Sequence, residues 1–270
     1  MHPTRFPELN QVLRTLVSWI QDTLPDAFVG FYLQGSFALG DFDDHSDVDF
    51  VVLVRDELEP SRVDRLQVIH DRTYQLDCEW AKHLEGSYFP LETFRDLTKS
   101  GTDVWYLDHG ARVLIPSAHC NTLVVRWVVR EQGIILHGPL PRTLIDPIPA
   151  ASLREEILHV IAGWGREILD NPARYANRFY QGFILLNYCR MLHDLRRGYP
   201  GSKREGAEWA KSAFNSSWSS PLIDRAWATR PDPARQVREP ADDEDFKQTL
   251  AFVELAINES GRMAGKGDCA

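Results

Sequence analysis

The residues that most constrain the fold are the seven consecutive positions Val48–Val54, which read VDFVVLV. All of them except Asp49 are apolar. An apolar run of this length, rich in valine, is typical of a strand inside a buried sheet rather than on a solvated surface. The sequence therefore predicts a sheet that is covered by other elements of the chain.

Strands and helices alternate through the first half of the chain. Apolar residues at helical spacing predict helices, whereas short apolar or alternating runs that end at glycine or proline predict strands. Residues 121–130 fit either state. The other predicted elements are a helix at residues 9–24, strands at 27–34, 48–54 and 83–89, a helix from Pro60 to about Lys82, and a short strand at 134–136.

A proline-rich stretch over residues 139–149 separates this half from the rest of the chain. Prolines at this density favour a stiff connection over a continuing helix or strand. Beyond it the pattern is only helical, over residues 152–169, 174–197, 202–214 and 243–262, and Ser152 and Glu155 have the spacing of a capping box. We expect an α/β (α+β) domain with a mixed sheet at residues 1–149 and an all-α helical-bundle domain at residues 150–270.

Composition excludes several classes of protein. The chain has 270 residues, 43% hydrophobic and 26% charged, which is the balance of a globular protein. No apolar run approaches the roughly 18 residues that a membrane-spanning helix needs, and the N-terminal residues lack the pattern of a secretory signal. The net charge of −9 disfavours nucleic-acid binding and would suit a cationic small substrate. We expect a cytoplasmic protein that binds neither membrane nor nucleic acid; the oligomeric state is not predicted.

Two short motifs, ten residues apart, carry the chemistry. Asp47 and Asp49 stand two positions apart at a strand start, where alternate side chains share one face, so their carboxylates converge. Such a pair suits Mg²⁺, which is usually held by one or two carboxylates together with substrate phosphates. Gly35 lets the backbone approach a phosphate closely, and Ser36 adds a hydroxyl donor. We count Ser46, next to the aspartates, among the nucleotide-binding residues.

The stretch FYLQGSFALGDFDDHSDVDFVV resembles the signature of the nucleotidyltransferase superfamily related to DNA polymerase beta. In that signature Gly-Ser is followed after about ten residues by Asp-x-Asp, with apolar residues on both sides. Gly35, Ser36, Asp47 and Asp49 match it position by position. The resemblance implies phosphate contact by Ser36 and metal ligation by the two aspartates.

The resemblance also implies a third carboxylate on a neighbouring strand, acting as general base or further metal ligand. Asp77 and Glu79 fall within the predicted helix that ends near Lys82, and Glu92 follows Pro90. Glu85 alone lies inside a predicted strand, so we prefer it to Glu79, the second choice.

Further stretches, including GIILHGPLPRTLIDPIP and NYCRMLHDLRRGYPGSKREGAEWA, resemble the streptomycin and spectinomycin adenylyltransferases over most of residues 25–215. That likeness implies that Arg190 and Lys203 reach the nucleotide phosphates from the helical domain. In one respect the sequence departs from the group: residues 177–182 carry no acid where the streptomycin-binding enzymes have one. The likeness therefore leaves the acceptor open.

The predicted function is metal-dependent transfer of AMP from ATP to a hydroxyl of an aminoglycoside-type antibiotic or a similar small acceptor. Two alternatives are weighed against it. The first is a nucleotidyltransferase that modifies a protein, as in toxin–antitoxin or regulatory systems, although the helices after the proline-rich stretch argue mildly against it. The second is a nucleotide-binding module without catalysis, and the complete set of carboxylates argues against that.

Overall fold

A computed structural model describes residues 3–44, 46–214, 218–230 and 237–265. The chain divides into two compact units, Met1–Ile148 and Pro149–Ala270, and each is considered by itself below. The expected boundary after residue 149 lies one residue away from this division. Within the described part of the chain, no helix has the length and hydropathy needed to cross a bilayer.

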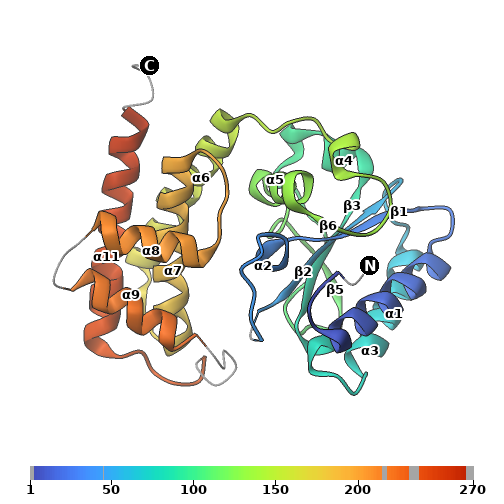
Figure 1. Cartoon of the computed structure of the whole chain (residues 1–270), viewed down its shortest axis with the longest axis horizontal. Coiled ribbons are helices and arrows are strands. Elements are labelled where there is room, and N and C mark those ends of the chain that lie inside the picture. The colour runs from blue at the N-terminus through green and yellow to red at the C-terminus, as the bar shows by residue number, and fades with distance from the viewer. Residues whose placement is uncertain (1–2, 45, 215–217, 231–236, 266–270) are drawn as a thin grey trace. The chain divides into compact units, whose positions relative to one another are not determined.

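The first unit is built on one six-stranded sheet in the order β5-β4-β3-β2-β1-β6 (Figure 1). Strands β2 and β3 run parallel, and all other neighbouring pairs are antiparallel, so the sheet is mixed, as predicted. Its strands are β1 (Phe28–Leu33), β2 (Val48–Val54), β3 (Leu84–Pro90), β4 (Val104–Leu107), β5 (Leu114–Ser117) and β6 (Ile134–His137).

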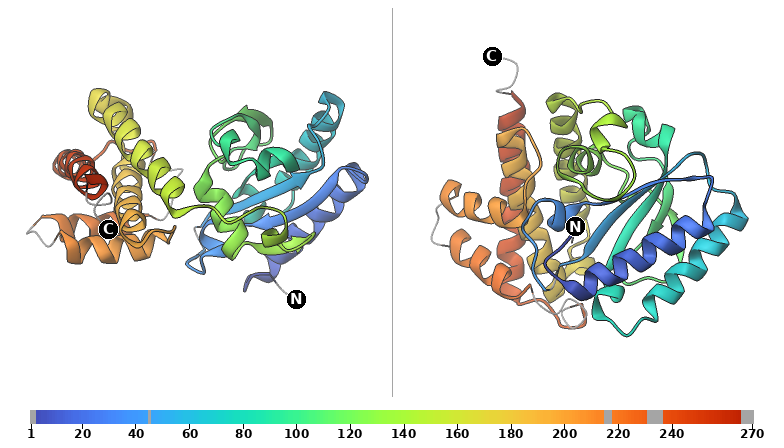
Figure 2. Two further views of the ribbon diagram at one scale, coloured as in Figure 1. Left: turned by 90° about the horizontal axis from the view of Figure 1, so that it is seen from above. Right: turned by 45° about the vertical axis from the view of Figure 1, so that its right-hand side comes forward.

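Helices bury both faces of the central strands. The first face packs on α1 (Pro7–Thr23) and α3 (Pro60–Tyr74), which lie side by side in Figures 1 and 2. Phe50 and Val52 point to that face, whereas Val51 and Leu53 alternate to the other, and all four are fully buried. On the second face Phe89 of β3 meets Phe94 of α4 (Leu91–Arg95), with ring centroids 5.4 Å apart. Both faces are covered, which explains the unbroken apolar run of β2.

One sequence prediction for this unit was wrong, and three elements were missed. The helix from Pro60 ends at Tyr74 instead of continuing to Lys82, and Glu79–Lys82 form a separate 3₁₀ helix. The lysine itself stabilises the break, because its ammonium group donates to the carbonyls of Leu76 and Cys78 in the connecting turn. Strands β4 and β5 and helix α4 were not predicted. The ambiguous segment is helix α5 (Leu123–Gln132), where the Thr122 hydroxyl caps the first turn.

The second unit is helical, as predicted. Its α-helices are α6 (Ala150–Asp170), α7 (Arg178–Arg197), α8 (Lys203–Ala213), α9 (Ser219–Ala228), which was not predicted, and α11 (Asp243–Gly265); short 3₁₀ helices elsewhere in the described chain are Leu97–Lys99, Pro141–Thr143 and Pro172–Tyr175. The capping box expected at Ser152 was wrong, because α6 already begins at Ala150 after Pro149. A capping box does form at the start of α8, where Ser202 and Glu205 each accept the other's backbone N–H.

Candidate active site

The fold aligns two carboxylates at one end of the parallel pair of strands. Asp49 of β2 lies directly opposite Glu85 of β3 in the strand register. Alternation along the two strands gives these residues the same side of the sheet as Val51 and Leu53, away from α1 and α3. Asp47 precedes β2, and its negative charge acts on Glu85. The acidic residues therefore collect where β2 and β3 begin.

Gly35 lets the first motif approach this carboxylate group. Its φ of +58° lies in the left-handed region, which residues with a side chain rarely adopt. A β-carbon at this position would lie 2.0 Å from Oδ2 of Asp49. The turn between β1 and the short helix α2 (Gly35–Ala38) thus passes directly over the Asp49 carboxylate, and only glycine leaves room for it.

The two serines of the motifs differ in their surroundings. The Ser36 hydroxyl is buried and has no hydrogen-bond partner among the described residues. A buried polar group is normally paired, so this donor is suited to an oxygen of a bound ligand. The Ser46 hydroxyl instead bonds within its own loop, accepting the Asp43 N–H at 2.9 Å and lying 3.3 Å from Asp43 Oδ1. Its predicted contact with nucleotide stays a prediction.

Glu85 sits in a shell of side chains that the sequence did not point to. The Tyr106 hydroxyl donates to its Oε1 at 2.7 Å and also lies 3.0 Å from Asp108 Oδ1. His119 Nε2 and Cys120 Sγ approach the same oxygen at 3.7 and 3.9 Å. Only 13% of the Glu85 side chain is exposed. The carboxylate is consequently held in one orientation by a neighbouring strand.

Charge and burial make this group of acids suitable for a cation. Burial raises the pKa of Glu85, the Tyr106 hydrogen bond opposes that rise, and the negative charge of Asp47 adds to it. The carboxylates of Asp47, Asp49 and Glu85 together supply the oxygen ligands that Mg²⁺ prefers. A divalent cation bound there would relieve their mutual repulsion. The ligand types therefore suit the predicted metal, and its binding by these three residues stays a prediction.

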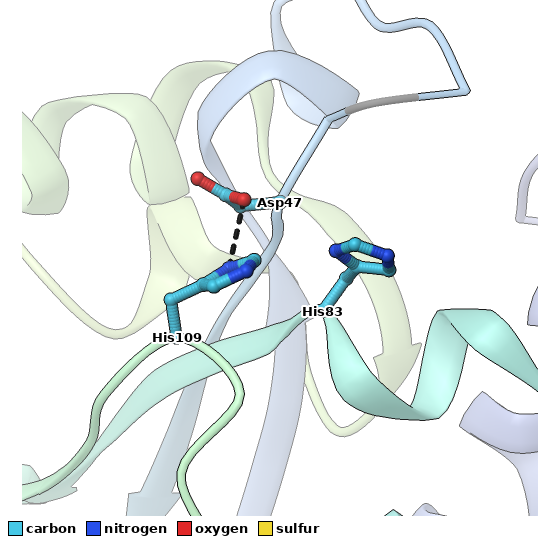
Figure 3. A group of neighbouring side chains, drawn as sticks. All are labelled: Asp47, His83 and His109. Atoms are coloured by element: carbon cyan, nitrogen blue, oxygen red, sulfur yellow. Dashed lines mark ion pairs between the residues drawn. The ribbon is translucent and has the colours of Figure 1, made fainter. Parts of the chain in front are cut away.

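Two histidines border the site on the side of Asp47 (Figure 3). His109 Nδ1 lies 2.8 Å from Asp47 Oδ1, and the bond with this carboxylate raises the pKa of His109. The His83 ring centroid is 5.3 Å from that of His109. Burial and the nearby charge of His109 lower the pKa of His83. Neither histidine was predicted, because each is near Asp47 only through the pairing of the strands.

The other candidates for the third carboxylate lie elsewhere. The Glu79 side chain is 83% exposed and pairs with His83 at 3.4 Å. Asp77 is exposed in the turn after α3, and Glu92 is exposed on α4. Glu85 alone lies opposite Asp49 on the neighbouring strand. Its role in catalysis stays a prediction.

The predicted phosphate-binding cations both lie on the α7–α8 pair of the second unit. A β-carbon on Gly206 of α8 would lie 2.5 Å from the Arg190 backbone, so the two helices are in close contact there. The Arg190 guanidinium donates to Asn187 Oδ1 at 3.0 Å. Lys203 is the first residue of α8, and its ammonium group lies 5.0 Å from the centroid of the Phe183 ring. Contact of either residue with nucleotide stays a prediction.

Comparisons with known proteins agree with this description. A nucleotidyltransferase domain model matches residues 17–100, and a model of the aminoglycoside adenylyltransferase C-terminal domain matches residues 143–257. The spectinomycin adenyltransferase AAD(9) from Enterococcus faecialis, crystallised with ATP and spectinomycin, has a similar fold, with a TM-score of 0.66 and 12% sequence identity. That match covers 92% of this chain and 98% of the other. No curated protein matches the chain in sequence.

The fold, the carboxylate group and the first of these domain matches define an enzyme of the nucleotidyltransferase class. The second domain match specifies the type: the chain has the two-domain composition of the aminoglycoside adenylyltransferases. The resemblance found in the sequence is confirmed.

Proposed function

We propose that the protein transfers AMP from ATP to a hydroxyl group of a small acceptor of the aminoglycoside type, with Mg²⁺ as the metal. The observation that carries the proposal is the pairing of Asp49 with Glu85, beneath a glycine turn that only Gly35 can make. In this proposal the carboxylate of Asp49 binds the metal, and the turn at Gly35 binds the phosphates. The AAD(9) structure, which contains ATP and spectinomycin, supports the choice of donor and acceptor class.

In the proposed reaction an acceptor hydroxyl oxygen bonds to the α-phosphorus of ATP. The bond from that phosphorus to the oxygen bridging towards the β-phosphate breaks, and pyrophosphate leaves with the electron pair. Glu85 accepts the hydroxyl proton, since its raised pKa brings the carboxylate closer to the operating pH of a general base. Mg²⁺ held by Asp47 and Asp49 would neutralise the phosphate charge.

The remaining residues bind and orient the nucleotide. The buried Ser36 hydroxyl would gain in the phosphate the hydrogen-bond partner that it otherwise lacks among the described residues. We assign Arg190 and Lys203 to the phosphates as well, because cationic side chains stabilise the charge that develops on departing pyrophosphate. Replacing either with alanine should therefore lower kcat more than it raises the KM for ATP.

The acceptor is tested in a sensitive bacterium that expresses the chain. Growth is compared on spectinomycin, streptomycin and other aminoglycosides, with Asp49→Asn as the inactive control, and the surviving drug is analysed by mass spectrometry. Resistance with a drug heavier by one AMP group supports the proposal. Labelling of a protein by radioactive ATP, without any modified drug, would instead support a protein acceptor. Nucleotide binding without transfer to any acceptor would support a non-catalytic module.

A further inference from the structure

A second group of possible metal ligands lies beside the carboxylates. It consists of Asp47, His83 and His109, which the structure brings together from three separate segments (Figure 3). One ligand atom from each residue lies within 4.8 Å of the other two. This Asp-His-His group differs chemically from the all-oxygen set of Asp47, Asp49 and Glu85, since two of its three ligands are imidazole nitrogens.

The backbone holds each member of this group in place. The carbonyl of His83 accepts the N–H of Val48 at 2.8 Å, which ties the histidine to the residue following Asp47. The N–H of His109 donates to Asp108 Oδ1 at 2.9 Å, and the same oxygen is near the Tyr106 hydroxyl. His83 therefore comes from the residue just before β3, and His109 comes from the turn after β4.

The side chains leave ligand atoms suited to an ion. Nδ1 of His83 is buried and has no hydrogen-bond partner among the described residues. A buried nitrogen without a partner is costly, and a bound cation would satisfy it. Asp47 directs Oδ1 towards His109. A carboxylate has two oxygens, so one aspartate can contribute a ligand to each of two neighbouring metal sites.

We propose that Asp47, His83 and His109 form a binding site for Zn²⁺. This site lies next to the proposed Mg²⁺ site, and Asp47 contributes a ligand to both. Imidazole suits Zn²⁺, whereas Mg²⁺ prefers oxygen ligands, so the two histidines make the group selective. Three protein ligands leave at least one coordination position for water or a substrate oxygen, as in zinc sites that are not purely structural. The inference does not depend on the transfer reaction proposed above.

The test uses Co²⁺ as a spectroscopic substitute for Zn²⁺, on the full chain without a histidine tag. Excess Mg²⁺ is present, so that the carboxylate set is already supplied with its preferred ion. Calorimetry should show one tight Co²⁺ site, and the visible spectrum should show the absorption of Co²⁺ bound to nitrogen. Zn²⁺ should displace the Co²⁺ and abolish that absorption.

Substitutions then locate the site. His83→Ala and His109→Ala should each weaken Co²⁺ binding by at least about tenfold, since even indirect partners of a metal ligand are worth that much. His159→Ala, which removes an exposed histidine of α6, should leave binding unchanged. Thermal melting of each variant, monitored by circular dichroism, checks that the fold is kept.

Two results would overturn the inference. The first is Co²⁺ binding that is absent in the wild type, or unchanged in both His83→Ala and His109→Ala. The second is loss of binding only in His119→Ala, because that would place the ion at the other cluster, formed by Glu85, His119 and Cys120. Neither result bears on nucleotidyl transfer, which is assayed separately with Mg²⁺ alone.

Discussion

A β-carbon on Gly35 would lie 2.0 Å from the Oδ2 atom of Asp49. The two motifs, separated in sequence by a loop, are thus in contact in space. The turn proposed to hold the phosphates can lie over the carboxylate proposed to bind the metal only because residue 35 has no side chain. In the proposed function, position 35 therefore links phosphate binding to metal binding.

Gly35→Ala should lower kcat/KM by at least about a hundredfold, since a displacement of about 1 Å at a reacting group costs that much. Gly40→Ala is the matched control. Gly40 also has a positive φ, of 72°, but no atom lies within 4 Å of the β-carbon that it would gain. The Gly40→Ala variant should lose about 1–2 kcal/mol of unfolding free energy through backbone strain, and its kcat should be unchanged. Equal losses of kcat/KM in the two variants would contradict the contact with Asp49.

Glu85→Gln should lower kcat by two to four orders of magnitude, roughly the contribution of a general base. The amide keeps the shape of the side chain but can neither accept the proton nor ligate a metal well. Glu79→Gln is the control, because the Glu79 side chain is 83% exposed and pairs with His83 at 3.4 Å, away from Asp49. Initial rates of pyrophosphate release distinguish the two variants. An active Glu85→Gln enzyme together with an inactive Glu79→Gln enzyme would reverse the assignment.

Tyr106→Phe should move the acid limb of the pH–rate profile to higher pH. The Tyr106 hydroxyl donates to the Glu85 carboxylate and so lowers a pKa that burial raises. Without that bond the pKa of Glu85 rises further, and the ionised base is lost at a higher pH. The measurement is kcat/KM against pH, with Tyr74→Phe on α3 as the control. A profile shifted to lower pH, or not shifted at all, would show that Tyr106 does not act on Glu85.

His70 should make the stability of the first unit depend on pH. Its ring is buried, Nε2 lies 2.7 Å from the Tyr88 hydroxyl oxygen, and burial lowers its pKa from 6.5 to about 4. The folded state thus binds the proton more weakly than the unfolded state. The stabilising effect of a neutral His70 is complete above pH 6.5 and is lost as pH falls towards 4. The loss amounts to about 3 kcal/mol.

The measurement for His70 is the unfolding free energy in urea at pH 7 and at pH 4. His70→Gln cannot take up a proton, so it should lose about 3 kcal/mol less than the wild type between these two values. His159→Gln, at an exposed position, should behave as the wild type does. If His70→Gln and the wild type lost the same free energy, His70 would not be the titrating group.

The central strands and the acidic motif were predictable because their signals are local. Val48–Val54 is strand β2 with the predicted bounds, since an unbroken apolar run has few alternatives to a buried strand. The choice of Glu85 needed only the assumption that the third carboxylate lies on a strand. The structure places it opposite Asp49.

The parts that sequence reasoning missed depend on contacts far apart in the chain. Strands β4 and β5 have four residues each, too few for alternation to stand out, and they pair only as an extension of β3. Tyr106 lies in β4 and His109 lies in the turn after it. Nothing near them in the sequence therefore connects them with Glu85 or Asp47. The predicted helix does not continue to Lys82, because Lys82 stabilises a turn that interrupts the helical spacing of apolar residues.

The most direct test of the central claim is Mg²⁺-dependent release of pyrophosphate from ATP in the presence of an acceptor. The wild type should release one pyrophosphate per adenylylated acceptor, and release should cease when Mg²⁺ is chelated. Asp47→Asn and Asp49→Asn should each lower the rate by about a hundredfold to a thousandfold, comparable to removing a group that stabilises transition-state charge. Asp44→Asn, in the exposed part of the same loop, should not. Full activity in Asp47→Asn or Asp49→Asn would contradict the account.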